Sequence, residues 1–179
     1  MDIRYNNIVV SGQFLTPQET IDKPFVSLSG LDTNKKYCLI MYDPNGVAGN
    51  YIHWIVDYIP GNNFREGINF FEYKQPTPPK GSGIHNYIFS LYESSPNKQI
   101  DKTLNDNNRT IELEYLLVKL NITGEPIYTK KFISEYREGG TNRRKLRTKR
   151  KIKTNTMLKR KRTNKRHKVI KKTNKHRKH

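Results

Sequence analysis

The chain has 179 residues and a formal net charge of +18, a length that suits one domain with its own core and excludes two such domains. Because Cys38 is the only cysteine, the chain cannot form an intrachain disulfide and is not a small secreted scaffold held together by disulfides. The apolar neighbours of Cys38 favour a buried structural thiol. The charge is concentrated at one end, because residues 141–179 contain 20 of the 34 Lys and Arg and none of the 16 Asp and Glu. The sequence thus predicts a nearly neutral folded domain over residues 1–140 and a disordered basic tail over residues 141–179.

The N-terminal residues 1–7 lack the basic and then apolar pattern of a secretory leader. No segment approaches the roughly 18 apolar residues of a membrane-spanning helix. We therefore expect a soluble, intracellular and cytoplasmic protein that is not secreted and has no transmembrane segment. The basic tail is compatible with nuclear entry, and we expect a monomer.

Strand signals dominate the first 140 residues, because short runs rich in β-branched and aromatic residues alternate with turn-forming residues. Residues 94–109 are dense in Asn, Asp, Lys and Ser and predict an exposed, mobile loop. At residues 129–138, the side chains of Phe132, Ile133 and Tyr136 are spaced to share one helical face. In chain order we predict strands at residues 8–10, 25–28, 37–42, 52–59 and 86–92, the loop at 94–109, a strand at 111–120 and a helix at 129–138. The fold class is therefore mainly β with little helix.

Two polar residues stand out within the predicted strands. Asp43 ends an apolar strand directly before a Pro-Asn-Gly turn, and Asp-Pro is also a common turn signal, so this carboxylate fits a structural or a functional role. His53 lies among aromatic and β-branched residues, where a histidine is often a satisfied core residue. Neither residue alone establishes a site.

The segment from Pro78 to Tyr87 joins two prolines, a Gly-Ser-Gly turn and a His-x-Tyr pair. Because side chains alternate across a strand, His85 and Tyr87 point to the same face. Rigid prolines beside permissive glycines let such a loop hold a fixed wall while its backbone approaches a ligand closely. The segment is therefore a candidate ligand-binding loop.

Together these stretches resemble the phosphatidylethanolamine-binding protein (PEBP) family, which includes Raf kinase inhibitor protein and the plant flowering regulators. The shared features are the Asp-Pro turn at 43–44, a His-bearing strand ending in Pro-Gly at 53–61, and a Pro-Pro-x-Gly-x-Gly-x-His-x-Tyr segment that leads to Tyr-Glu over residues 78–93. They occur in the family's order. The resemblance covers residues 37–93 well and the flanking residues loosely.

The resemblance implies a PEBP-like fold, with a large central antiparallel sheet packed on a smaller sheet and a few peripheral helices. It also implies a small anion pocket at one end of the sheet for phosphate-type groups, including the phosphoethanolamine headgroup. Two imidazoles and a phenol supply hydrogen-bond donors to such a group, and a nearby carboxylate orients an imidazole. Carried onto this chain, the ligand-binding residues are Asp43, His53, Pro78, Pro79, His85 and Tyr87.

The chain departs from the family pattern in three ways. Asn45 replaces a second Asp of the family turn, which removes one negative charge from the pocket margin, and Asn86 stands where the family commonly has an Arg. Relatives usually follow a helix similar to residues 132–136 with another strand, whereas this chain continues into the basic tail. The resemblance therefore implies that the fold lacks its final strand. We do not carry over inhibition of a kinase or a protease.

Three functions remain as alternatives. The first is a non-enzymatic binding protein, with a possible regulatory role, that needs no cofactor or metal and takes a phosphate-containing small ligand or a phospholipid headgroup. The second is a protein that binds nucleic acid or another polyanion through residues 141–179 by counterion release. The tail contains no aromatic residues, which argues against stacking on nucleic-acid bases. The same positive charge also suits peripheral contact with an anionic membrane. The third is a hydrolase that uses His53 or His85 as general base. Because no Ser or Cys lies in a recognisable nucleophile motif, we predict that the protein is not an enzyme.

Overall fold

The structure is a computed structural model and describes residues 1–95 and 104–137. The predicted tail over residues 141–179 lies outside the described residues, as do residues 96–103 of the predicted loop. Within the two described ranges, no helix is long and apolar enough to cross a membrane.

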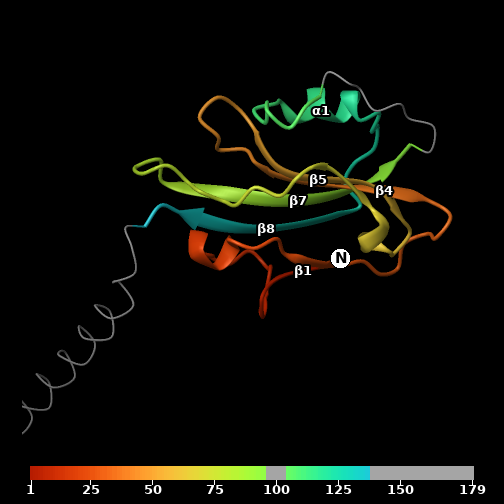
Figure 1. The fold of residues 1–179 in the computed structure, drawn as a ribbon, viewed down its shortest axis with the longest axis horizontal. Coiled ribbons are helices and arrows are strands. Elements are labelled where there is room, and N and C mark those ends of the chain that lie inside the picture. Colours follow the sequence, from red (N-terminus) through yellow and green to blue (C-terminus); the bar gives the residue numbers. More distant parts are fainter. Residues whose placement is uncertain (96–103, 138–179) are drawn as a thin grey trace, which may run out of the picture. The chain divides into compact units, whose positions relative to one another are not determined.

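Five antiparallel strands form the central sheet of the domain (Figure 1). The strands predicted at residues 37–42, 52–59 and 86–92 are confirmed and form its middle. The short strand at one edge was not predicted. In sheet order the strands are β6 (Ile68–Phe71), β5 (Tyr51–Pro60), β4 (Lys36–Asp43), β7 (Ile84–Ser94) and β8 (Tyr128–Glu135).

A smaller sheet contains the N-terminal strands and confirms the predicted strands at residues 8–10 and 25–28. Its first two strands are joined through Asn6, whose φ of 52° suits a tight turn. Two short 3₁₀ helices, η1 (Pro17–Thr20) and η2 (Phe64–Glu66), lie in the connections. In sheet order the strands are β2 (Ile8–Val9), β1 (Asp2–Tyr5) and β3 (Phe25–Ser27).

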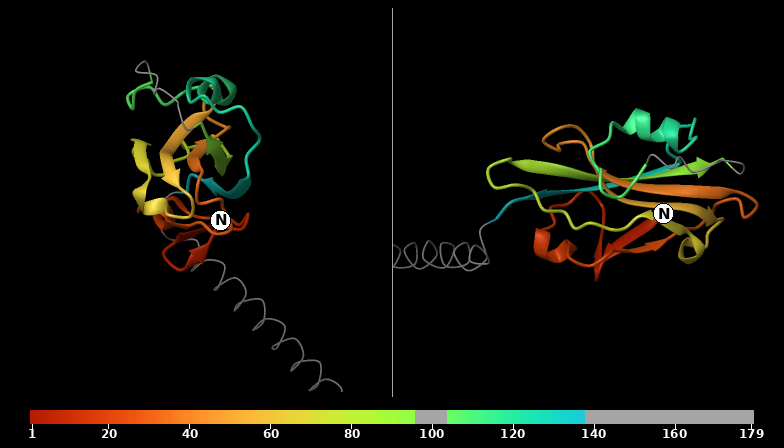
Figure 2. Two further views of the ribbon diagram at one scale, coloured as in Figure 1. Left: turned by 90° about the vertical axis from the view of Figure 1, so that its right-hand side faces the viewer. Right: turned by 45° about the horizontal axis from the view of Figure 1, so that its top comes forward.

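The central sheet is covered on both faces, as Figures 1 and 2 show. The smaller sheet packs on one face, and the helix α1 (Leu113–Lys119) packs on the other. For this reason every residue of β4 from Tyr37 to Met41 is buried, and the strand reads as a continuous apolar run instead of an alternating one. The predicted fold, a large antiparallel sheet packed on a smaller one with little helix, is confirmed.

The predicted strand at residues 111–120 is wrong, because this segment contains α1. Its leucines at 113, 116, 117 and 120 recur at spacings of three and four residues, which is a helical period. Leu116 and Leu120 are buried in the cluster on that face of the central sheet. The helix ends where Asn121 takes a left-handed φ of 49°.

The predicted helix at residues 129–138 is also wrong, because residues 128–135 form β8 and pair with β7. Phe132 and Ser134 are both buried and lie two residues apart, which is the period of a strand. The outer edge of β8 is hydrogen-bonded to residues 12–15. Since α1 precedes β8 and β8 completes the sheet, the expected loss of a final strand is wrong too.

The predicted exposed loop at residues 94–109 is confirmed at residues 105–108, which are exposed, and is wrong at the buried residues on either side of them. Ser94 ends β7 and is buried. Leu104 and Arg109 are also buried, so the segment returns to the core before α1 begins.

Replacing Phe132 with Ala should lower the free energy of unfolding by about 3–5 kcal/mol, because its fully buried ring packs against Tyr5, Tyr87 and Phe89. Tyr136→Ala, at a half-exposed side chain that a helix would place on the same face, should cost less than about 1 kcal/mol. Urea denaturation measures both values. Equal losses at the two positions would contradict the assignment of β8 as a strand.

Candidate ligand-binding site

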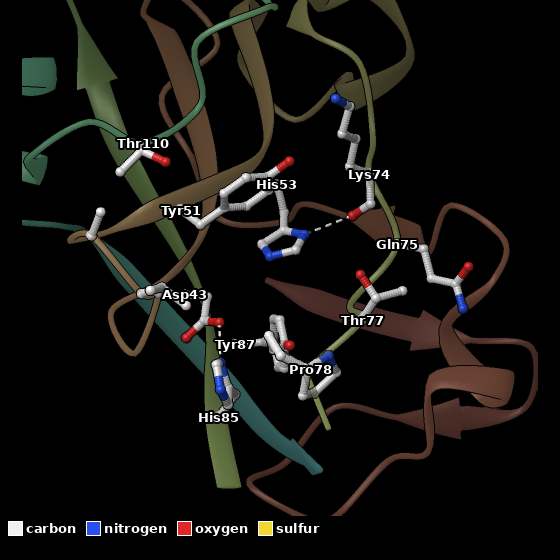
Figure 3. A pocket seen from close by; sticks show the side chains of 14 residues that line it. Asp43, Tyr51, His53, Lys74, Gln75, Thr77, Pro78, His85, Tyr87 and Thr110 are labelled. Atoms are coloured by element: carbon white, nitrogen blue, oxygen red, sulfur yellow. Dashed lines mark hydrogen bonds and ion pairs between the residues drawn. The ribbon is translucent and has the colours of Figure 1, made fainter. Parts of the chain in front are cut away.

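A cavity of about 470 Å³ lies at one end of the central sheet, where β4 ends and β5 and β7 begin (Figure 3). Its volume is in the range of small-ligand sites. Within the described ranges, no group of three or more His, Cys, Asp or Glu side chains is arranged to hold a metal ion. All six residues expected to bind ligand line the cavity, together with Gly46, Val47, Ala48, Tyr51, Lys74, Gln75, Thr77 and Thr110.

His53 is the extra residue of a β-bulge between β4 and β5. The register passes from Met41 opposite Trp54 to Tyr42 opposite Ile52, which leaves His53 without a partner on β4. Bulges redirect side chains and often lie beside functional sites. The local backbone therefore sets the direction of this imidazole.

The protonation state of His53 follows from its hydrogen bonds with Lys74. The carbonyl of His53 accepts from Lys74 N at 2.8 Å, and His53 Nδ1 lies 2.8 Å from the carbonyl of Lys74. Since a carbonyl can only accept, Nδ1 carries the proton and Nε2 keeps its lone pair. Burial is the main cause that lowers the pKa of His53 to about 4. At neutral pH the ring is therefore uncharged, and its remaining nitrogen is an acceptor.

Aromatic rings fix the imidazole from two sides. The ring centroids of Tyr51 and Tyr87 lie 4.9 and 5.2 Å from that of His53. In Figure 3 the three side chains gather at the cavity, whereas the side chain of Lys74 extends away from it. Lys74 therefore contributes to the His53 environment through its backbone.

Arg109 anchors the backbone behind His53. Its guanidinium is buried and donates to the carbonyl oxygens of Ile52, His53 and Glu72 at 3.1, 3.0 and 2.7 Å. It also pairs with Asp106, and its positive charge contributes to the low pKa of His53. The planar fork of five N–H donors lets one arginine join the start of β5 to the chain that follows β6.

Asp43 and His85 form a buried pair between β4 and β7. Asp43 Oδ1 accepts from the backbone N–H of Asn45 at 2.8 Å, and Asp43 Oδ2 lies 2.6 Å from His85 Nδ1. His85 Nε2 lies 2.8 Å from Ser82 Oγ, which lies 2.8 Å from the carbonyl oxygen of Pro79. Ser82 Oγ thus lies within hydrogen-bond distance of both His85 Nε2 and the carbonyl oxygen of Pro79. The Asp43 carboxylate can only accept, so it accepts from His85 Nδ1 and orients the imidazole.

Ser82 therefore stands beside a histidine and a carboxylate, a setting that the sequence did not reveal. In a nucleophile of this kind, the histidine accepts the hydroxyl proton. Here Ser82 Oγ lies 2.8 Å from both His85 Nε2 and the carbonyl oxygen of Pro79, so the carbonyl competes with the imidazole for the hydroxyl proton. The contact holds the turn between Gly81 and Gly83, both with φ near 80°, against His85. A ligand must displace Ser82 to reach His85 Nε2.

Tyr87 presents a phenol at the cavity. Burial and then the negative charge of Asp43 raise the pKa of Tyr87, so the hydroxyl keeps its proton at neutral pH. Its ring stacks on Phe132, with centroids 5.1 Å apart and planes at 17°. No described residue hydrogen-bonds to its hydroxyl, which leaves this donor available to a ligand.

Arg109 and Thr110 are two neighbours of the cavity that the sequence did not predict. Arg109 lies in the segment predicted as an exposed loop, and Thr110 lies between that loop and the next predicted strand. Thr110 forms a β-bridge with Tyr51, and the carbonyl of Arg109 accepts from Ile52 N. These contacts join residues almost 60 positions apart in the sequence. No local pattern marks such a partner, so it could not be found from periodicity or turn signals.

The family model of phosphatidylethanolamine-binding protein matches residues 6–129 of the chain. A 26 kDa secreted antigen of Toxocara canis is 36% identical over 94 residues, which cover 49% of this chain and 36% of that protein. Protein BROTHER of FT and TFL 1 of Arabidopsis thaliana is 36% identical over 95 residues, which cover 49% of this chain and 52% of that protein. The chain thus spans about half or less of the length of these two curated relatives.

A solved structure also resembles the described domain. The phosphatidylethanolamine-binding protein from Plasmodium vivax aligns with a TM-score of 0.62 at 17% identity, covering 76% of this chain and 84% of that one. At this level of identity the likeness supports a common fold.

The low pKa of His53 should make stability depend on pH. Because the folded pKa of about 4 lies below the unfolded value near 6.5, the unfolded chain binds this proton more readily, and the contribution to stability is lost as pH falls from about 6.5 to 4. Wild type should lose about 3 kcal/mol more than His53→Gln across that window, measured by urea denaturation at each pH. Parallel curves for the two proteins would show that His53 is not held neutral by the fold.

Proposed function

Since the chain belongs to the phosphatidylethanolamine-binding protein family, we propose that it is a non-enzymatic binding protein whose cavity takes a phosphate-type group, as a free small ligand or as a phospholipid headgroup. One observation carries the proposal. The hydroxyl of Tyr87 and the ring of His53 line the same 470 Å³ cavity as the Asp43–His85 pair. These groups suit recognition of a polar headgroup.

The roles of the site groups differ from those that the sequence predicts. The sequence predicts two imidazoles and a phenol as donors to an anion. At neutral pH, Tyr87 donates, His53 Nε2 accepts, and His85 Nε2 is held by Ser82. A phosphate group that keeps one proton matches this set, because Tyr87 donates to one of its oxygens while its P–OH donates to His53.

The carboxylate of Asp43 gives the proposed headgroup a second point of recognition. A carboxylate has about four lone-pair sites, of which Asn45 N and His85 Nδ1 use two. Asp43 lines the cavity and is therefore suited to accept from an ammonium group. A zwitterion such as phosphoethanolamine carries both the phosphate and the ammonium.

We propose a regulatory role for this binding, carried out by a monomer inside the cell. The word secreted in the name of the Toxocara canis relative describes that protein.

A second proposed function is polyanion binding through residues 141–179. These residues carry 20 Lys and Arg and no acidic side chain, whereas residues 1–140 carry 14 basic and 16 acidic residues. Association with nucleic acid by counterion release needs only such charge. The two proposed functions use different parts of the chain and are independent.

Anion binding in the cavity should strengthen as pH falls, because a bound anion favours the protonated form of His53 and gains a donor from it. Sulfate is a suitable probe because its charge stays constant between pH 7 and 5. If the anion raises the pKa of His53 by about two units, sulfate affinity should rise about tenfold over that range. NMR titration of the full chain, followed at the His53 and Tyr87 side chains, measures it.

Three variants separate the parts of this prediction. His53→Gln should make sulfate affinity independent of pH, and Tyr87→Phe should weaken binding at both pH values by removing a donor. Ser82→Ala should strengthen binding, because it frees His85 Nε2 for the anion. Phosphoethanolamine tests the ammonium contact of Asp43 in the same assay. No perturbation of His53 or Tyr87 by millimolar sulfate or phosphoethanolamine would refute the anion pocket.

Binding of the full chain to a random-sequence DNA duplex should weaken by about a thousandfold between 50 and 200 mM salt. Replacing the 20 Lys and Arg of residues 141–179 with Gln should abolish it. Fluorescence anisotropy with a labelled duplex measures both effects. If the variant with Gln at these 20 positions bound the duplex as tightly as wild type, DNA binding would not depend on residues 141–179, and this second function would be refuted.

A further inference from the structure

A second cavity, of about 270 Å³, lies beside β5 and β6 and shares no lining residue with the first. Its walls come from β3 and the residues before it, from β5, and from the η2 segment. We call it the aromatic groove. The residues that matter for its chemistry are Lys23, Phe25, Trp54, Phe64, Arg65 and Asn69.

Trp54 forms a fixed floor for the aromatic groove. Its side chain is 1% exposed, its Nε1–H donates to Asn69 Oδ1 at 2.8 Å, and its ring meets that of Phe64 edge to face at 5.5 Å. At the rim, Phe25 is 55% exposed. Aromatic surfaces that are already held in place bind a partner at low cost in conformational entropy.

Two cations border this aromatic floor. Lys23 Nζ lies 5.8 Å from the centroid of the Trp54 ring, and Arg65 is exposed on η2. Neither forms an ion pair or a hydrogen bond with another described side chain. The carboxylates next to them in sequence do not line the groove, and Glu66 accepts instead from Asn63. The groove thus combines an apolar floor with two positive charges that form no ion pair with a described carboxylate.

We propose that the aromatic groove docks an acidic segment of a partner protein that inserts one large apolar side chain between flanking carboxylates. The apolar side chain would pack on Trp54 and Phe64, and the carboxylates would pair with Lys23 and Arg65. Charge complementarity carries the choice of occupant, and it also excludes the chain's own basic tail. The volume is below that of most small-molecule sites and suits one inserted side chain. Tryptophan and arginine are also the residues that most often dominate protein interfaces.

Trp54 gives this proposal a local readout, because it is the only tryptophan in the chain. The probe is the acetylated and amidated peptide Glu-Glu-Phe-Glu-Glu, titrated to millimolar concentration into the full chain at 150 mM salt. The indole N–H resonance of Trp54 should shift in a saturable way. The matched peptide Glu-Glu-Ala-Glu-Glu has the same charge, so it should bind the basic tail equally but shift the indole much less.

Charge-reversal variants locate the contact. Lys23→Glu and Arg65→Glu should each weaken the effect of the Phe peptide at least about fivefold. Lys131→Glu, which makes the same change on the exposed face of β8 at the opposite edge of the central sheet, should leave it unchanged. All three side chains are exposed, so these variants should fold, and an unchanged indole resonance without peptide checks this.

Three results would overturn the proposal. The first is an indole resonance that does not move, or that moves equally with the Phe and Ala peptides. The second is a shift that depends on protein concentration without peptide, which would assign the groove to a second copy of the chain. The third is a response to phosphatidylserine vesicles in the absence of any response to peptide, which would assign it to a lipid surface. None of these outcomes depends on whether the first cavity binds an anion.

Discussion

The coverage of β4 on both faces is the constraint on which the rest of the domain depends. With the smaller sheet on one side and α1 on the other, residues 37–41 and Asp43 of β4 are buried, so the carboxylate at the end of the strand must find partners inside the protein. Asp43 finds them in Asn45 N and His85 Nδ1. The buried pair joins β4 to β7 at the edge of the cavity, so the packing of the core and the composition of the site have the same origin.

The two histidines have different surroundings. His85 donates from Nδ1 to the carboxylate of Asp43, and its Nε2 contacts the hydroxyl oxygen of Ser82. His53 meets a backbone carbonyl on one nitrogen, is buried, and lies near the cation of Arg109, so it stays neutral with a free lone pair. The cavity therefore offers a donor and an acceptor side by side, which is the basis of our proposal that it takes a proton-bearing phosphate or a zwitterionic headgroup.

Much of this could be predicted from the sequence. The strands of the central sheet have strong β signals, and the motif over residues 78–87 led to the residues that line the cavity. The wrong predictions concern two segments whose apolar residues fit both a helix and a strand. The leucines of residues 111–120 were taken as strand although their spacing is helical, and Phe132, Ile133 and Tyr136 suggested a helix although Phe132 and Ser134 alternate in a strand. Arg109, the bulge at His53 and the Ser82 contact depend on distant segments or on register, which local patterns do not encode.

The proton on His53 is the most direct test of this account, because the fold, the bulge and the Lys74 contact all act on it. Long-range ¹H–¹⁵N NMR correlation of the full chain at neutral pH distinguishes the two neutral tautomers from the charged ring. The account predicts a neutral His53 with its proton on Nδ1. A charged His53 ring, or a neutral ring with its proton on Nε2, would contradict it.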